Sequence, residues 1–234
     1  SVPTEIIIRT PDNGEVNREG TVVINGTLVD LVQRTLSDAT IDVSLDGQVF
    51  TTVTTDSEGN FQVIYVVPAG AELGEIEFAI RFNGDIYNLS SDATSKWLVF
   101  SVINITIDEI EPHAVGETVT FSGFVSDNML VGIVGHTVKV YFDGVEVGEA
   151  NTTDGGAWTF DYDLPLGTDW GEHTVKVRAL EQPYYRDGQT TTTMYVAHHS
   201  SITIYASKLN MNRGDSWNLS GTLIDSDDPS SSGI

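Results

Sequence analysis

Hydrophobic and polar residues alternate with a period of two along much of the chain. In residues 40–45, Ile, Val and Leu occupy every second position between Thr, Asp and Ser, and residues 137–142 carry the same kind of pattern. Successive side chains of a strand point to opposite faces of a sheet, so this alternation buries one face. No segment of useful length has the 3.6-residue period of a helix. The pattern therefore predicts an all-β protein.

Turn residues divide the alternating segments into strands. Asp46-Gly47 and Asp143-Gly144 can supply the positive φ angles that a tight hairpin needs. About seven short strands per hundred residues, separated by such turns, predict an immunoglobulin-like β-sandwich. The strands expected in the first hundred residues are 4–10, 20–30, 40–46, 48–55, 60–67, 75–83 and 95–103.

The chain repeats itself with a period just under one hundred residues. The segment Val22–Gly26 returns at Val119–Gly123, 97 residues on, and again at Trp217–Gly221, 98 residues further. Repeats of this kind indicate tandem domains. The predicted division is a first β-sandwich at 1–100, a second at 101–198 and the first strands of an incomplete third at 199–234.

The two joins between repeats differ in composition. Residues 97–106 pass from one repeat into the next without Gly or Pro, which predicts a short, stiff linker and a rod-like array. Residues 195–202 include more polar side chains and predict a looser join.

The third repeat supplies only two strands, roughly 201–208 and 215–225, and a two-stranded hairpin is marginal alone in water. Two explanations stay open: the chain is a piece of a longer protein, or a neighbouring subunit adds the missing strands. The turn-like residues at 227–232 favour the first. The side chains expected to face inward here are Ile202, Ile204, Trp217, Leu219 and Leu223.

A turn motif links these repeats to a known class of domain. The run T-D-x-x-G-x-F at Thr55–Phe61, with the V-x-[FI]-x-G strand and the [LF]-D-G hairpin, resembles bacterial and archaeal Ig-like repeat domains of large surface proteins. The second repeat departs from it at Asp154–Trp158, where only the small size of the turn is kept. The resemblance implies a surface or secreted scaffold and brings no catalytic residue with it.

Composition narrows the classes of partner. The chain has 34 acidic and 11 basic residues, a net charge of −23, so it should repel nucleic acid and anionic lipid. The acids are scattered, which favours solvation in a saline medium over divalent-cation binding. Cysteine is absent. With the resemblance, this indicates a prokaryotic extracellular or cell-surface protein, and no apolar run is long enough to insert directly into a membrane.

Sequence signatures of an enzyme are missing. There is no G-x-S-x-G, H-E-x-x-H or phosphate-binding glycine loop, so we expect no catalytic residue. The four Trp residues occupy positions where other repeats keep apolar residues, which predicts that they lie in the core or cover loops. Tyr184-Tyr185 is the better candidate for an exposed aromatic pair. The adjacent His198 and His199 would make a poor chelate and are interpreted as linker residues.

Calcium is the one cofactor that the composition makes a candidate, since oxygen ligands are abundant. Asp56 and Glu58 lie in a run similar to part of a calcium loop, although a plain turn explains them equally well. Asp108, Glu109 and Glu111 follow the first join, where a cation could stiffen it.

Five Asn-x-Ser/Thr sequences are candidate glycosylation sites. They are Asn25, Asn88, Asn104, Asn151 and Asn218. Alternation turns Asn25 and Asn218 outward, and Asn151 lies in a predicted turn.

The function predicted from these observations is structural: a scaffolding segment of an extracellular stalk, surface layer or filament. The alternative is an adhesin or a substrate-binding accessory module of a secreted hydrolase. The expected partners are other repeats of the same protein or neighbouring subunits, with strand addition at the third repeat as one route.

Overall fold

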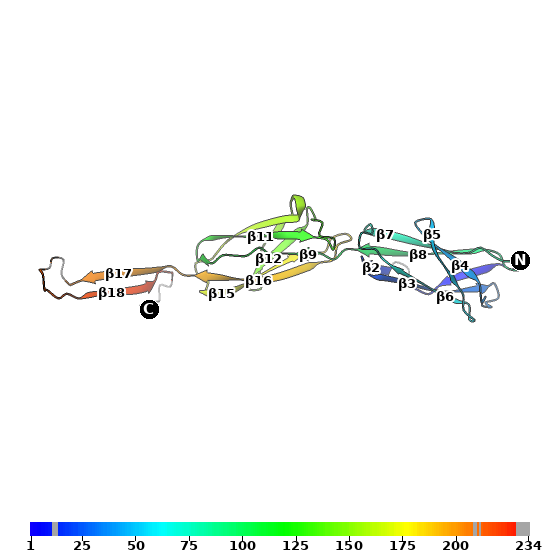
Figure 1. Cartoon of the computed structure of the whole chain (residues 1–234), viewed down its shortest axis with the longest axis horizontal. Coiled ribbons are helices and arrows are strands. Elements are labelled where there is room, and N and C mark those ends of the chain that lie inside the picture. Colours follow the sequence, from blue (N-terminus) through cyan, green and yellow to red (C-terminus); the bar gives the residue numbers. More distant parts are fainter. Residues whose placement is uncertain (11–13, 208–209, 211, 228–234) are drawn as a thin grey trace. The chain divides into compact units, whose positions relative to one another are not determined.

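A computed structural model describes residues 1–10, 14–207, 210 and 212–227 of the chain (Figure 1). The chain forms two compact units. Unit 1 comprises Ser1–Asn104, Ser126–Val131 and Glu181–Gly188. Unit 2 comprises Ile105–Val125, Gly132–Leu180 and Gln189–Ile234. Two loops that the sequence repeat places in the second domain therefore belong to unit 1.

Unit 1 is a sandwich of two sheets. The three-stranded sheet has the order β1-β3-β6, and the five-stranded sheet has the order β2-β8-β7-β4-β5. Most pairs are antiparallel, while β2 runs parallel to β8. The strands are β1 (Thr4–Ile8), β2 (Gly14–Asn17), β3 (Thr21–Asp30), β4 (Thr40–Leu45), β5 (Gln48–Thr54), β6 (Asn60–Val66), β7 (Gly74–Phe82) and β8 (Ser91–Phe100).

The core of unit 1 comes from the apolar positions of the alternating pattern. Their side chains fill the space between the sheets, as is usual for a β-sandwich. No cysteine is available to bridge the sheets, so apolar packing holds them together. The fully buried members of this core are Val22, Ile24, Leu28, Ile41, Val43, Phe78, Ile80 and Val99.

Unit 2 repeats this arrangement. Its sheets have the orders β14-β11-β9 and β10-β16-β15-β12-β13, with β10 parallel to β16, and a separate two-stranded sheet pairs β17 with β18. A 3₁₀ turn at Asp154–Gly156 precedes β14. The strands are β9 (Asn104–Ile105), β10 (His113–Ala114), β11 (Thr118–Ser126), β12 (Thr137–Phe142), β13 (Val145–Asn151), β14 (Ala157–Asp163), β15 (Gly171–Ala179), β16 (Gly188–Ala197), β17 (Ser200–Ala206) and β18 (Leu219–Asp225).

The two Asp-Gly hairpins form as the sequence predicts. Asp46 and Gly47 have φ angles of 49° and 82°, and Asp143 and Gly144 have 46° and 82°. Two consecutive positive φ angles give a turn whose twist matches that of the flanking strands. These turns join β4 to β5 and β12 to β13.

The all-β prediction is confirmed, with differences at strand ends. The predicted first strand stops at Ile8, and the chain then makes the separate strand β2, which the apolar pattern did not indicate. β2 has one buried side chain, Val16, so its four residues carry almost no alternation. The strand predicted to start at 95 starts at Ser91, because its polar first half pairs along β7.

The prediction that all four tryptophans lie in the core or cover loops is wrong for Trp170. Trp158 is buried as expected, and Trp97 is partly buried. The Trp170 side chain, however, is 74% exposed, since it lies in the loop before β15 rather than on a strand. The five residues expected to face inward in the hairpin of β17 and β18 are also exposed. The predicted turn at 227–232 lies, apart from Asp227, outside the described residues.

Candidate binding site and the recurring aspartate

An aspartate recurs at the same place in each repeat, just where the second long strand of the repeat ends. Asp30 ends β3, Asp127 follows β11 and Asp225 ends β18, at the 97- and 98-residue spacings of the other landmarks. Each Oδ1 accepts a 2.9 Å hydrogen bond from the backbone N–H two residues on. Such Asx turns are local and stable. Sequence reasoning missed this motif, although its spacing would have revealed it.

The Oδ2 atom of each aspartate accepts from a different cationic side chain. Asp30 pairs with Arg34 of its own turn, and the Arg34 side chain is 74% exposed. Asp127 pairs with Arg18 within unit 1, at 2.9 Å, and both side chains are almost buried. Asp225 pairs with His198 within unit 2, at 2.8 Å. The same kind of turn therefore accepts from three different partners. These are Arg34 of the same turn at Asp30, the nearly buried Arg18 at Asp127, and the titratable His198 at Asp225.

Arg18 is held on several sides. Its Nε donates to the Ala71 carbonyl at 2.7 Å, and its Nη1 donates to Asp127 and to the Asn128 side chain. Ser101 Oγ also donates to Asn128, at 2.9 Å. Three or more hydrogen bonds to one nearly buried guanidinium compensate the loss of water around the charge. These contacts hold the 126–131 loop in unit 1.

The loop 181–188 is held in unit 1 by a second arginine. Arg186 Nη2 lies 2.6 Å from Glu15 Oε2, and its guanidinium lies 3.7 Å from the centre of the Phe100 ring. The Tyr184 ring also contacts the Phe100 ring. The Tyr184-Tyr185 pair is therefore not a flat exposed platform: Tyr184 is exposed but packed, and Tyr185 is half-buried.

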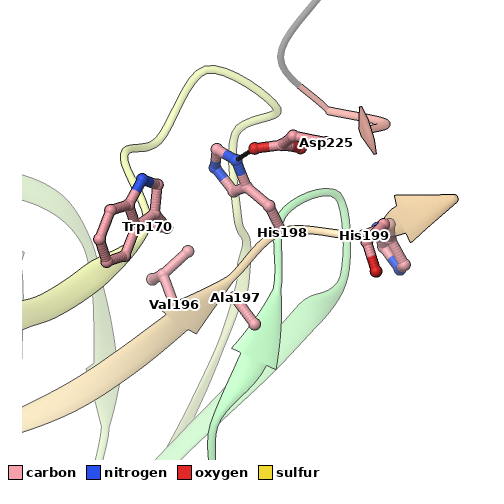
Figure 2. A pocket seen from close by; sticks show the side chains of 7 residues that line it. Trp170, Val196, Ala197, His198, His199 and Asp225 are labelled. Carbon is pink, nitrogen blue, oxygen red and sulfur yellow. Dashed lines mark hydrogen bonds and ion pairs between the residues drawn. The ribbon is translucent and has the colours of Figure 1, made fainter. Parts of the chain in front are cut away.

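His198 donates from both ring nitrogens. Nδ1 lies 2.8 Å from Asp225 Oδ2, and Nε2 lies 2.9 Å from the Thr168 carbonyl (Figure 2). Neither oxygen carries a proton to give, so both contacts need the imidazolium form. The bond to the Thr168 carbonyl and then the bond to Asp225 raise the pKa of His198 above its usual value.

His173 follows the same pattern. Nδ1 lies 2.6 Å from Asp143 Oδ2 and Nε2 lies 2.8 Å from the Asp169 carbonyl. Burial acts to lower the pKa of His173, but the bonds to Asp143 and the Asp169 carbonyl outweigh it, so this pKa is raised. Two imidazoles thus hold consecutive carbonyls of one loop.

A cavity of about 380 Å³ lies beside this loop. Trp170, Val196, Ala197, His198 and Asp225 are among its lining residues, and Figure 2 shows Trp170 and His198 on neighbouring parts of its wall. An exposed indole beside a carboxylate can stack on a ligand ring, whereas both ring nitrogens of His198 are already bonded to Asp225 and to the Thr168 carbonyl. This is the candidate binding site of unit 2.

The similarity of this chain to known proteins is a similarity of fold. No protein-family model matches the sequence, and no curated protein matches it. The ICAM-5 D1-D4 ectodomain fragment aligns with a TM-score of 0.51 at 9% identity, over 85% of this chain and 55% of that one. The chain has an immunoglobulin-like fold.

Two further similar structures also consist of tandem domains. Sidekick-1 immunoglobulin domains 1-5 aligns at 15% identity and a TM-score of 0.49, over 87% of this chain. A tetra-tandem repeat from the extending region of a large adhesion protein aligns at 16% identity and a TM-score of 0.33, over 95% of this chain. This chain spans 40% of the first and 56% of the second.

Asp56 and Asp108, one from each candidate calcium site, accept hydrogen bonds from neighbouring residues. Asp56 Oδ1 accepts the backbone N–H groups of Glu58 and Asn60 at 2.8 Å, so it closes its own turn. The bond from Asn60 is the largest cause of the lowered pKa of Asp56. Asp108 accepts from Ser122, while Glu109 and Glu111 are exposed. Within the described residues, no three acidic, His or Cys side chains form a group that could hold a metal ion.

The five candidate glycosylation sites differ in whether the side-chain amide nitrogen of the Asn donates a hydrogen bond. Asn88 Nδ2 donates to Asp85, and Asn104 Nδ2 donates to the Asp127 carbonyl. Asn25 and Asn151 are exposed and use their amide oxygens as acceptors from Gln62 and Thr137. Asn218 is exposed on the third hairpin. No helix among the described residues has the length and apolar character needed to cross a membrane.

Proposed function

We propose that this chain is a non-catalytic, structural repeat segment of an extracellular cell-surface protein of a prokaryote, part of a stalk, layer or filament. The observation that carries the proposal is the repetition of one sandwich architecture, with a three-stranded and a five-stranded sheet in each unit. Tandem repeats of one fold suit a structural array.

The surface charge supports an exterior location. A net charge of −23 keeps a protein solvated and disfavours binding to nucleic acid or anionic lipid. Without cysteine, the stability of both units depends on apolar packing and hydrogen bonds. Other repeats of the same protein are its natural partners.

Surface labelling of the cells that produce the protein tests its location. A membrane-impermeant amine reagent should label the chain on intact cells, through partly exposed lysines such as Lys96, and brief external protease treatment should remove it. Labelling that appears only after lysis would contradict the proposal. Electron microscopy of the extracted protein should then show a layer, filament or stalk.

Glycans would fit three of the five candidate sites. Asn25, Asn151 and Asn218 present exposed side chains whose amide nitrogens make no hydrogen bond within the described chain, whereas those of Asn88 and Asn104 are engaged. We expect modification at the first three. Intact mass and peptide mapping of protein from its native cells measure this, and an unmodified mass would exclude it.

A binding module is the second candidate function, favoured by the exposed indole of Trp170 beside the cavity of unit 2. An oligosaccharide array probed with the full chain tests it. If the cavity binds sugar, W170A should weaken the interaction about tenfold or more, as for other aromatic contact residues. The matched control is W217A, because Trp217 is exposed outside the cavity. If the chain bound no glycan, the structural function would be the one remaining proposal.

A further inference from the structure

A short turn recurs in both units and presents a backbone carbonyl to a cationic side chain. It ends at Ala71 in unit 1 and at Thr168 in unit 2, 97 residues on. A backbone hydrogen bond of 3.1 Å closes each turn, from the Ala71 N–H to the Pro68 carbonyl and from the Thr168 N–H to the Pro165 carbonyl. The carbonyls of Ala71 and Thr168 are therefore equivalent acceptors.

In unit 1 one guanidinium joins this carbonyl to the recurring aspartate. Arg18 Nε donates to the Ala71 carbonyl at 2.7 Å, and Arg18 Nη1 donates to Asp127 at 2.9 Å. Arginine keeps its charge throughout the pH range in which proteins are folded. This bridge therefore does not respond to pH through its cation.

In unit 2 an imidazole makes the equivalent bridge. His198 Nε2 lies 2.9 Å from the Thr168 carbonyl and Nδ1 lies 2.8 Å from Asp225 (Figure 2). The cation comes from a different place in the repeat, because His198 follows β16 whereas Arg18 follows β2. The place of Arg18 is taken by the buried Val115. Equivalent oxygens are thus bridged by a different cation, and this one can titrate.

Loss of one proton from His198 must break one of the two bonds. A neutral imidazole has one N–H group and one lone pair, whereas the Asp225 carboxylate and the Thr168 carbonyl can only accept. The lone pair would then face an oxygen less than 3 Å away. The bonds to the Thr168 carbonyl and to Asp225 raise the pKa of His198. The complete bridge therefore exists below this raised pKa and is lost as the pH rises through it.

Most charged groups on the elements packed against His198 are carboxylates. They lie in the loop of residues 165–170, at the end of the hairpin of β17 and β18, and just after β10, which pairs with β16. Carboxylates favour the imidazolium, so this surrounding supports the closed bridge. The carboxylates are Asp169, Asp225, Asp227 and Glu117, and the titratable neighbours are His113 and His199.

Burial contributes little to holding the hairpin against the 165–170 loop. All seven residues of β17 are exposed, as are the first six of β18. His198 and Asp225 line two cavities, of about 380 and 370 Å³, so the packing around the bridge is loose. An element without buried apolar side chains depends on its polar contacts for a fixed position.

We propose that His198 is a proton-controlled link, which fixes the β17–β18 hairpin to the 165–170 loop while the imidazole is charged and frees the hairpin when the proton leaves. Arg18 makes the form of the same bridge that does not titrate. This inference goes beyond the proposed function, because the link would act in the same way in a structural array or in a binding protein.

Spin labels on the two sides of His198 test the link in the full chain. Cysteine is absent from the sequence, so T191C in β16 and Y205C in β17 introduce the two labelling sites, both at exposed positions. We expect one narrow peak of label-to-label distances at acid pH and loss of that peak at alkaline pH. The midpoint should equal the pKa of His198 measured by NMR in the same chain. A narrow peak that persists at alkaline pH would overturn the proposal.

Three variants of the labelled chain assign the effect. H198A removes both donors and should lose the narrow peak at every pH. D225N removes the charged acceptor and should move the midpoint to lower pH. The matched control is H199A, because His199 is the next residue but bonds to Asp227, and it should keep the original midpoint. A transition that survives in H198A, or one that H199A abolishes, would overturn the role assigned to His198.

Discussion

Arg18 is a polar side chain whose removal should destabilise unit 1. R18A leaves the Asp127 carboxylate nearly buried with no cation beside it, and losing one partner of a buried pair costs about 3 kcal/mol. We expect the calorimetric transition of unit 1 to move down by several degrees.

R81A is the control, because Arg81 pairs with Asp92 in the same unit and both side chains are exposed. Exposed pairs contribute about 0 to 1 kcal/mol, so the transition of unit 1 should hardly move. Equal effects of R18A and R81A would show that the Arg18 pair is no stronger than a surface contact.

His198 and His173 should make unit 2 sensitive to pH. Their folded pKa values are raised, so the stability they add is complete below the ordinary histidine pKa of about 6.5 and is lost as the pH rises through the folded pKa. The charged groups near His198 are Asp225, Asp227 and Asp169. We expect the transition of unit 2 to fall on going from slightly acid to slightly alkaline pH.

An NMR titration of the imidazoles separates the two histidines. D225N removes the charged acceptor of His198, so the pKa of His198 should drop while that of His173, which depends on Asp143, stays in place. A His198 titration unchanged by D225N would contradict the assigned contact.

Strand glycines provide a test at the scale of elements. A Cβ on Gly123 would lie 2.0 Å from the Thr106 carbonyl oxygen, so G123A must push the start of the second repeat away from β11. We expect a loss of about 2 kcal/mol or more, in the range of overpacked cores, and a lower transition of unit 2.

G167A is the matched control for this element, because a Cβ at Gly167 meets nothing within 4 Å and its φ angle is not positive. The free energy of unfolding of unit 2 in this variant should stay within about 0.5 kcal/mol of the parent value. Similar losses in both variants would show that the close approach to β11 is not the cause.

Elements with strong alternation or fixed turn chemistry were predictable, and weakly patterned ones were not. The strand at 40–45 and the Asp-Gly turns follow from local residue choice. β2 has a single buried residue and exists because its backbone finds β8 beside it. Such a strand depends on a partner more than seventy residues away, which a local pattern cannot indicate.

Metal removal gives a test at the scale of the whole molecule. Asp56, Glu58, Asp108, Glu109 and Glu111 form no ligand group among the described residues, and Asp56 is occupied by its own turn. We therefore expect EDTA to leave both calorimetric transitions unchanged, with added calcium as the comparison. A drop of several degrees that calcium reverses would establish a calcium site.

The sequence by itself determined the immunoglobulin-like sandwich, the repeat of just under one hundred residues and the two strands of the last hairpin. Each depends on local alternation, turn residues or self-similarity, which can be identified in the amino-acid sequence itself. Only the tertiary structure decided that Arg18 meets Asp127, that His198 meets Asp225, and that the exposed Trp170 lies beside the second of these pairs. These contacts join residues that are distant in sequence, so the folded backbone, and not the spacing of residues, brings them within hydrogen-bonding distance.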